Sequence, residues 1–528
     1  MNTLLPLLPP LIVFVLGAIT HRVIFSLLMG VISAVLIATD GSLTDSFYLI
    51  CQSLWNNCET LKWTSWDSFV STNKLFVVGF ILCSSILFHL MQRSNGVDAL
   101  VHLSSKKIKN ARSAETTSLL LSHGLFIDGC LSSITVSSII RPIADRFKIP
   151  RLKTALLADS MSGPLVVICP FSCFSALLIG LLHNNGVEAT VTKGTLLHAN
   201  PNMIYWMALP FSLYSLTIIA TFWMVVRARI SLGEMRRHEE SVEQTPPKTS
   251  SEKHQGNIWN FVIPTTLFPI FILAYIVIMD KGGASVWQML TEAPISFVLF
   301  ASSLSTLVLS VIYFYFMDNF SLREIASVSI SSIKGGMPSV MIIILAWTLA
   351  DILRNQLHFG QEISSLISGA VPLFLMPLVF FWVSGLVSSL LGTSWGTVAI
   401  FIPLVAPIVI HLQGIQPPVG IEQVPLLLPS LGAVVSGAAF GDHVSLLSDS
   451  TVLSCVGAKC HPVDHVKTQF LYAIPVFLGS SLGFLLAGMF GTGFLGLWTV
   501  IPLVASVMCS LLLVILMSAR GLRRARTH

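Results

Sequence analysis

The stretch Gly441-Asp442-His443-Val444-Ser445-Leu446-Leu447-Ser448-Asp449-Ser450-Thr451 decides the fold class, because it places carboxyl and hydroxyl groups inside a long apolar run over residues 426–455. An ionised carboxylate is costly in a membrane span, so an acidic residue there is by default a functional candidate. On a continuous helix Asp442, Ser445 and Asp449 would share one face, since they are three and four residues apart. The stretch therefore predicts a polar site within a membrane-spanning segment.

The composition of the whole chain agrees with a membrane setting. Of the 528 residues, 54% are hydrophobic and 10% are charged, and the mean hydropathy is +0.80. An ordinary soluble domain is roughly 25% charged, so a water-soluble globule is excluded. Apolar runs of about 20 residues recur along the chain, which is the length of a transmembrane helix. The sequence predicts an all-α polytopic protein in a lipid bilayer.

Other classes of function find little support in the sequence. The net charge of +5 gathers in short segments and does not indicate a nucleic-acid partner. The chain has no GxxxxGK[ST] phosphate loop for ATP-driven transport, and its nine cysteines lack metal-ligand or redox spacing, so no cofactor is expected. Cys51 and Cys58 lie in a polar stretch that we expect outside, where a disulfide could persist, although two free thiols are the favoured interpretation.

The basic residues predict the topology, because Lys and Arg concentrate in cytoplasmic connections. They cluster in six segments that should share one side: 93–112, 141–153, 227–253, 323–334, 459–467 and 520–526. The first two clusters flank the apolar run 117–140, so this run has to enter and leave on the cytoplasmic side. We expect a re-entrant hairpin with its tip near Asp128; one tilted helix that departs from the charge rule is the alternative.

A second hairpin of opposite orientation is expected over 371–412, with its tip at Gly392-Thr393-Ser394-Trp395-Gly396-Thr397. A long, broken span follows each hairpin, 154–182 in the first case and 426–455 in the second. Inverted repeats with broken helices are typical of secondary transporters, whose substrate site lies at the repeat interface. The sequence thus predicts two inverted repeats, with about 11 crossings plus two re-entrant hairpins, the N-terminus outside and the C-terminus inside.

This plan divides the chain into six regions. They are 1–74, N-terminal spans and an external loop; 75–226, the first transport repeat; 227–257, a cytoplasmic linker without a folded core; 258–370, connecting spans; 371–518, the second transport repeat; and 519–528, a basic cytoplasmic tail. The linker assignment follows from its Glu, Arg, Ser and Pro content.

The polar residues of the broken spans are the candidate ion-binding groups. A buried carboxyl can hold either a proton or a metal ion, which is the minimal chemistry of cation/proton exchange. The candidates are Asp128, Asp159, Ser160, Asp442, His443, Ser445, Ser448, Asp449 and Ser450, with Asp442 and Asp449 expected to bind Na⁺.

Several of these positions also have a structural interpretation. The hydroxyl groups could form a polar seam between helices, and His443 could relay protons or bond a backbone carbonyl. Asp159 could pair with Lys153 or Arg151. Arg141 could contact a substrate carboxylate or extend to lipid headgroups.

Seven motifs together resemble those of the NhaC-type sodium/proton antiporter family. They are Phe126-Ile127-Asp128, Arg141-Pro142-Ile143-Ala144-Asp145, Ala158-Asp159-Ser160, Gly392-Thr393-Ser394-Trp395-Gly396-Thr397, Gly441-Asp442-His443, Ser448-Asp449-Ser450-Thr451 and Asp464-His465-Val466-Lys467-Thr468-Gln469. The resemblance implies an ion-transporter-superfamily fold in a bacterial or archaeal inner membrane, and Na⁺/H⁺ exchange or, in some relatives, Na⁺-linked movement of small carboxylates or amino acids. It also implies that Thr393 and Ser394 are oxygen donors beside the four aspartates.

The chain departs from the family pattern at three places. Gly129 stands where members usually carry a second Asp, Leu446 where they carry Pro, and His461-Pro462 where they carry an Asp-His pair. The change at Gly129 removes one carboxylate that could hold a cation.

Three functions compete at this stage. The leading hypothesis is a non-enzymatic Na⁺/H⁺ exchanger of the bacterial inner membrane, with a periplasmic N-terminus and a cytoplasmic C-terminus. The alternative is a Na⁺-coupled transporter or exchanger of a small organic acid or amino acid, and an intramembrane enzyme or non-transporting scaffold is the third. The oligomeric state, a homodimer among the options, stays open.

Overall fold

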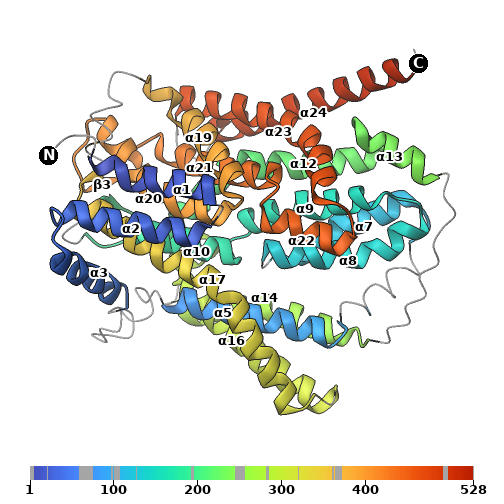
Figure 1. Ribbon diagram of the computed structural model, residues 1–528, viewed down its shortest axis with the longest axis horizontal. Coiled ribbons are helices and arrows are strands. Elements are labelled where there is room, and N and C mark those ends of the chain that lie inside the picture. The colour runs from blue at the N-terminus through green and yellow to red at the C-terminus, as the bar shows by residue number, and fades with distance from the viewer. Residues whose placement is uncertain are drawn as a thin grey trace.

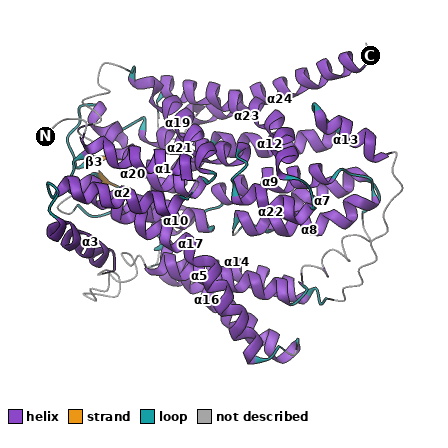
Figure 2. Ribbon diagram, viewed as in Figure 1, coloured by secondary structure: helices purple, strands orange, loops and turns teal. Residues whose placement is uncertain are grey.

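The chain folds into a bundle of helices, most of which run along the long axis of the molecule (Figure 1). The computed structural model describes residues 5–20, 22–58, 75–96, 99, 108–126, 128–191, 195–243, 256–280, 285–318, 320–359, 362, 371–491 and 497–526. Within these residues, eight helices are long and apolar enough to cross a membrane, or up to eleven if each of three bent pairs is one span. The structure confirms the predicted all-α polytopic fold (Figure 2).

The elements of the described residues are as follows. The α-helices are α1 (Leu8–Thr20), α2 (Val23–Ala38), α3 (Leu43–Cys58), α5 (Leu75–Arg93), α7 (Ala111–Gly124), α8 (Gly129–Arg146), α9 (Arg151–Ile168), α10 (Cys173–Asn184), α11 (Pro201–Ala208), α12 (Leu213–Ala228), α13 (Glu234–Glu243), α14 (Trp259–Met279), α15 (Val286–Glu292), α16 (Ile295–Met317), α17 (Leu322–Asn355), α19 (Met376–Leu391), α20 (Ser394–Leu412), α21 (Leu427–Val444), α22 (Asp449–Ala458), α23 (Pro462–Phe490) and α24 (Leu497–Arg526). Short 3-10 helices cover Leu5–Leu7, Leu209–Phe211, Leu373–Leu375 and Ile421–Gln423.

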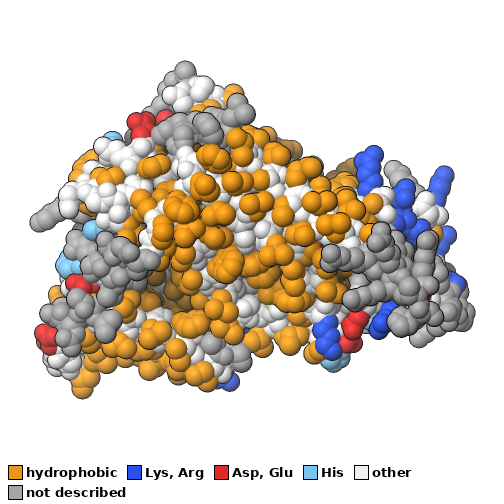
Figure 3. All heavy atoms as spheres, turned by 90° about the horizontal axis from the view of Figure 1, so that it is seen from above, with side chains coloured by type: hydrophobic (Ala, Val, Ile, Leu, Met, Phe, Trp, Pro, Cys, Tyr) orange, Lys and Arg blue, Asp and Glu red, His pale blue; other side chains and the backbone are white. Residues whose placement is uncertain are grey.

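The surface has the polarity of a protein that crosses a bilayer. Figure 3 shows hydrophobic side chains over the middle of the visible face and Lys and Arg side chains at its right end. Figure 1 places α13 and the end of α24 at that same end. We call it the basic end of the molecule.

Both predicted hairpin tips coincide with breaks in helices. In the first hairpin α7 ends at Gly124 and α8 begins at Gly129, and in the second α19 ends at Leu391 and α20 begins at Ser394. Figure 1 shows α7 and α8 side by side at the basic end, whereas α19 and α20 lie toward the opposite end. The two hairpins therefore enter from opposite ends, as the charge pattern predicts.

Each hairpin is followed by a bent pair of helices, and these pairs join the two halves of the chain. The pairs α9 with α10 and α21 with α22 are each bent by 42°. The half-helix α22 packs against α8 of the first hairpin, and the half-helix α10 packs against α20 of the second hairpin. The breaks of both bent pairs therefore meet near the centre of the bundle.

A three-stranded parallel sheet also links the halves. Its strands are β1 (Val187–Glu188), β2 (Leu197–His198) and β3 (Val419–Gly420), in the order β1-β2-β3. Leu197 pairs with Val187 and with Val419. The sheet therefore fastens the loop that follows α10 to the loop that follows α20.

The predicted linker 227–257 contains more structure than its composition suggests. It includes α13, which packs its fully buried Met235 against the bundle. Glu239 of this helix bonds Lys153 at the start of α9, with 2.6 Å between the charged atoms. The polar composition of this segment gives no indication of the apolar contact or of the ion pair. Residues 244–255 lie outside the described residues.

The side chain of Cys58 also lies outside the described residues, so the expectation for Cys51 and Cys58 stays a prediction.

Candidate functional site

The break between α21 and α22 lies within the polar stretch 441–451. α21 ends at Val444, and Ser448 caps α22 by accepting a hydrogen bond from the backbone N–H of Thr451. Because the helix does not continue through 445–448, helical spacing does not place Asp442, Ser445 and Asp449 on one face. The chain turns there, and the hydroxyl of Ser450 donates to Asp442 Oδ2 at 3.2 Å.

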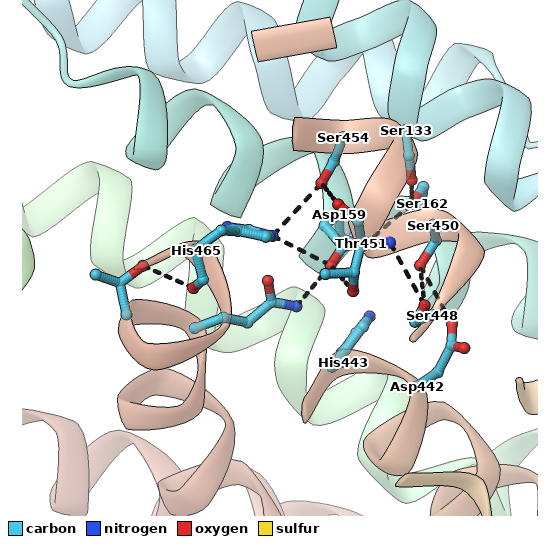
Figure 4. A network of polar contacts seen from close by, with 12 residues as sticks. Ser133, Asp159, Ser162, Asp442, His443, Ser448, Ser450, Thr451, Ser454 and His465 are labelled. Carbon is cyan, nitrogen blue, oxygen red and sulfur yellow. Dashed lines mark hydrogen bonds and ion pairs between the residues drawn. The ribbon is translucent and has the colours of Figure 1, made fainter. Parts of the chain in front are cut away.

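Asp159 of α9 forms a second polar centre, next to the first (Figure 4). Its side chain is fully buried, and Oδ2 accepts hydrogen bonds from Thr451 Oγ1 at 3.0 Å and from Gln469 Nε2 at 2.9 Å. His465 Nε2 lies 3.4 Å from the same oxygen. Oδ1 of Asp159 has no hydrogen-bond partner within the described residues. The carboxylate thus receives its contacts on one oxygen and leaves the other unpaired.

The basic residues near Asp159 have other partners. Lys153 lies 2.8 Å from Glu115 Oε1 as well as 2.6 Å from Glu239 Oε1, and Arg151 donates to both oxygens of Asp145. The alternative that Asp159 pairs with Lys153 or Arg151 is therefore wrong.

His443 links α21 to α12 and lies against α9. Its Nδ1 lies 3.0 Å from the hydroxyl of Tyr214 on α12. The imidazole is 1% exposed, and a Cβ added to Gly163 of α9 would lie 3.6 Å from its Nε2. The two roles expected for His443, a proton relay or a bond to a backbone carbonyl, stay predictions.

The first hairpin tip is capped by Asp128. Its Oδ1 accepts from the backbone N–H of Leu131 at 2.9 Å, and Oδ2 accepts from Cys173 Sγ at 3.5 Å. A Cβ on Gly129, the position that lacks the second Asp, would lie 3.6 Å from the Cα of Gly163. Asp128 therefore fixes the start of α8, and Gly129 lies close to α9.

The second hairpin tip contacts the α21–α22 break. Thr393 caps α20 by accepting from the N–H of Gly396, and Gly392 has φ +70°. A Cβ on Gly392 would lie 2.5 Å from Cβ of Leu447. Only glycine accommodates both this backbone conformation and this close approach.

A cavity of about 670 Å³ lies between two walls of helices and connects most of these groups. One wall comes from α5, α14 and α17, and the other contains both hairpin tips and the α21–α22 break. The predicted site residues that line it are Asp128, Thr393, Ser394, Asp442, His443, Asp449 and Ser450. Asp159, Ser160, Ser445 and Ser448 are buried and do not line it.

Four residues that complete the Asp159 centre were not predicted as site residues: Tyr214, Thr451, His465 and Gln469. A signal existed for two of them, because His465 and Gln469 are polar residues four positions apart on one face of α23. Tyr214 could not be assigned, since its position beside His443 depends on a contact across 229 residues of chain.

Comparisons with known proteins agree with the geometry. A profile of the Na⁺/H⁺ antiporter family matches residues 166–489. The chain is 28% identical over 503 residues to an uncharacterised protein of Haemophilus influenzae, which covers 93% of this chain and 92% of that protein. It is 26% identical over 246 residues to the malate-2H⁺/Na⁺-lactate antiporter of Bacillus subtilis, a match that covers 44% of each chain.

A solved structure shares the fold. The Alcanivorax borkumensis YdaH transporter superposes with a TM-score of 0.54 over 87% of this chain and 88% of its own, at 12% sequence identity. At this identity the likeness concerns the fold alone.

Proposed function

Because the chain belongs to the Na⁺/H⁺ antiporter family, we propose that it exchanges Na⁺ for H⁺ across a bacterial inner membrane, with Asp442 and Asp449 as the Na⁺ ligands. The family membership confirms the resemblance found in the sequence, and it makes the chain a secondary transporter rather than an enzyme. The transported ions, and the residues that hold them, are what we propose.

The observation that supports the proposal is a succession of interacting carboxylates. Asp128, Asp442 and Asp449 line one cavity, and the fully buried Asp159 is connected to Asp442 through the neighbouring residues Ser450 and Thr451. Carboxylates this close in a low-dielectric interior repel one another unless a proton or a cation neutralises some of them. Na⁺ and H⁺ therefore compete for the same groups, and this competition is the basis of exchange.

The first turn of α22 links the cation site to the Asp159 centre. Ser450 donates to Asp442, while its neighbour Thr451 donates to Asp159. Na⁺ prefers oxygen ligands, and the hydroxyl of Ser450 is available beside the two carboxylates. The Asp159 centre fixes the position of this turn through Thr451. Binding of an ion at Asp442 and Asp449 is therefore coupled to the positions of α9 and α23.

The basic end of the molecule supports an orientation. Lys and Arg gather there (Figure 3), and such residues are enriched on the cytoplasmic side of membrane proteins. The C-terminal helix α24 ends at the basic end, so we propose a cytoplasmic C-terminus and a periplasmic N-terminus.

The first test is proton flux in vesicles that contain the purified protein and a pH-sensitive dye. Addition of Na⁺ to an imposed proton gradient should change the fluorescence, and addition of K⁺ should not. Asp449→Asn should abolish the Na⁺ response, because it removes one negative charge from the ligand set.

A matched variant controls for the loss of any aspartate. Asp351 lies near the end of α17, accepts from Asn355 and does not line the cavity, so Asp351→Asn should keep the response. A folded Asp449→Asn protein that still exchanges Na⁺ for H⁺ would rule out the assigned ligand.

The alternative of an organic acid as substrate is not favoured by the site. Arg141, its proposed carboxylate partner, donates to the backbone carbonyl of Gly457 at 2.9 Å and does not line the cavity. None of the described residues that line the cavity is a lysine or an arginine. An anion would meet three carboxylates there without a permanent positive charge to balance them.

A further inference from the structure

The volume of the cavity exceeds what a metal ion requires. At about 670 Å³ it falls within the range of roughly 300–1,000 Å³ that is usual for pockets that hold small organic ligands. A Na⁺ ion at Asp442 and Asp449 would occupy one corner of this space. The remainder extends between the hairpin tips and the wall of α5, α14 and α17.

The charge of the lining selects the sign of an organic ligand. Asp128, Asp442 and Asp449 all line the cavity, and the described lining contains neither lysine nor arginine. Of the two lining histidines, His443 Nδ1 contacts the hydroxyl of Tyr214, and His89 Nδ1 contacts the carbonyl of Ser85. The cavity therefore attracts cations and repels anions.

Aromatic rings supply the other half of a site for an organic cation. Phe88 of α5 and Phe268 of α14 line one wall, and Phe174 of α10 and Trp395 of the second hairpin tip line the other. An ammonium group over an aromatic face gains cation–π attraction, most strongly over Trp, and this attraction increases when water is excluded. Carboxylates and aromatic rings in one cavity are the pattern expected for an ammonium ion with an apolar body.

We propose that this cavity binds and transports a small organic ammonium ion, in exchange for protons, at the carboxylates that also take Na⁺. The inference rests on the proposed cation-binding role of Asp442 and Asp449. It adds a substrate class that the size, the charge and the aromatic lining of the cavity favour.

Gly335 of α17 allows the two substrates to be separated. It lines the cavity, and a Cβ added there would meet no atom within 4 Å. Its neighbour Gly336 is packed, since a Cβ there would lie 3.4 Å from Leu82. A large side chain at position 335, on the wall opposite the carboxylates, would therefore start in open space beside the cavity.

The experiment uses the full-length protein in dye-loaded vesicles, with tetramethylammonium, choline and benzyltrimethylammonium as probes. Quaternary ions have no proton to lose, so they do not cross the bilayer as neutral bases. We expect each probe to drive proton flux that is absent from protein-free vesicles. Gly335→Phe should raise the half-saturating concentration of benzyltrimethylammonium at least about tenfold and that of Na⁺ by less than about twofold.

Gly420→Phe is the matched control, because a Cβ there also meets no atom within 4 Å and Gly420 lies in β3, away from the cavity. It should change neither value. Flux with Na⁺ but with none of the three quaternary ions would overturn the inference and leave Na⁺/H⁺ exchange standing. Flux with a quaternary ion but not with Na⁺ would support the inference and remove Na⁺ from the proposed function. Flux driven by malate or lactate instead would contradict the inference.

Discussion

The carboxylate of Asp159 is fully buried, and its Oδ2 accepts hydrogen bonds from Thr451 and Gln469 and lies 3.4 Å from His465 Nε2. Gln469→Leu removes the donor at 2.9 Å. A hydrogen bond to a charged group contributes about 1.5–3 kcal/mol. If the Asp159 centre holds the first turn of α22, we expect Na⁺/H⁺ exchange to fall about 10- to 100-fold in vesicles.

The control for this change is Gln356→Leu, at the exposed end of α17. It should keep wild-type exchange. Full exchange by a folded Gln469→Leu protein would limit the Asp159 centre to a structural role that one lost hydrogen bond does not disturb.

Two glycines with the same backbone conformation separate local strain from packing. Gly392 and Gly414 both have φ +70°, but a Cβ on Gly392 would collide with Leu447, whereas one on Gly414 would meet no atom within 4 Å. Gly414→Ala should cost about 1–2 kcal/mol of stability, from the left-handed conformation alone. Gly392→Ala should cost more and should also abolish exchange, because it separates the second hairpin tip from the α21–α22 break. Thermal unfolding in detergent measures the loss of stability, and vesicle flux measures the loss of exchange. Equal losses of stability in the two variants would show that Leu447 moves away from the added methyl group at no cost.

At the scale of elements, Lys153 of α9 pairs with Glu239, which holds α13 to the bundle, and with Glu115 of α7. Lys153 and Glu115 are each 3% exposed. Lys153→Met should destabilise the protein by about 3–5 kcal/mol, because it leaves the buried charge of Glu115 without a partner. Adding Glu115→Gln should recover part of this loss. A double variant that is no more stable than Lys153→Met would contradict this account.

Glu239→Gln should mainly release α13 from the bundle, because it removes the negative charge that pairs with Lys153. Limited proteolysis at Arg236 or Arg237 would detect this release.

The elements differ in how far the sequence predicts them. The hairpin tips were predictable, because charge clusters on both sides of 117–140 forbid a single crossing and Gly392 marks a turn. The docking of α13 was not, since its single buried Met235 cannot be recognised in a polar segment. The face shared by Asp442, Ser445 and Asp449 was predicted wrongly because helical spacing was applied across a break at 445–448. Gln469 and Thr451 acquire their role only through contact with Asp159, some 300 residues away.

At the scale of the whole molecule, the carboxylates that we expect to bind ions lie where the two halves of the chain meet. The half-helix α22 packs on the first hairpin, and α10 packs on the second, so the cavity lies where the halves interlock. Three ionised carboxylates around one cavity, Asp128, Asp442 and Asp449, repel one another and so oppose this assembly until a cation or proton is bound. Folding stability and ion binding are therefore linked.

This linkage predicts that Na⁺ stabilises the folded protein. It also predicts that, without Na⁺, repulsion between the carboxylate ligands lowers the free energy of unfolding. At about 100 times its dissociation constant, Na⁺ should add about 2.7 kcal/mol to the free energy of unfolding. Asp449→Asn should be more stable than wild type in K⁺ at neutral pH, since it removes repulsion, and it should lose most of the Na⁺-dependent rise in the unfolding temperature. Asp351→Asn should keep the full rise. A variant at Asp449 that is less stable than wild type in K⁺ yet keeps the response to Na⁺ would indicate that this carboxylate supports the fold and that Na⁺ binds elsewhere.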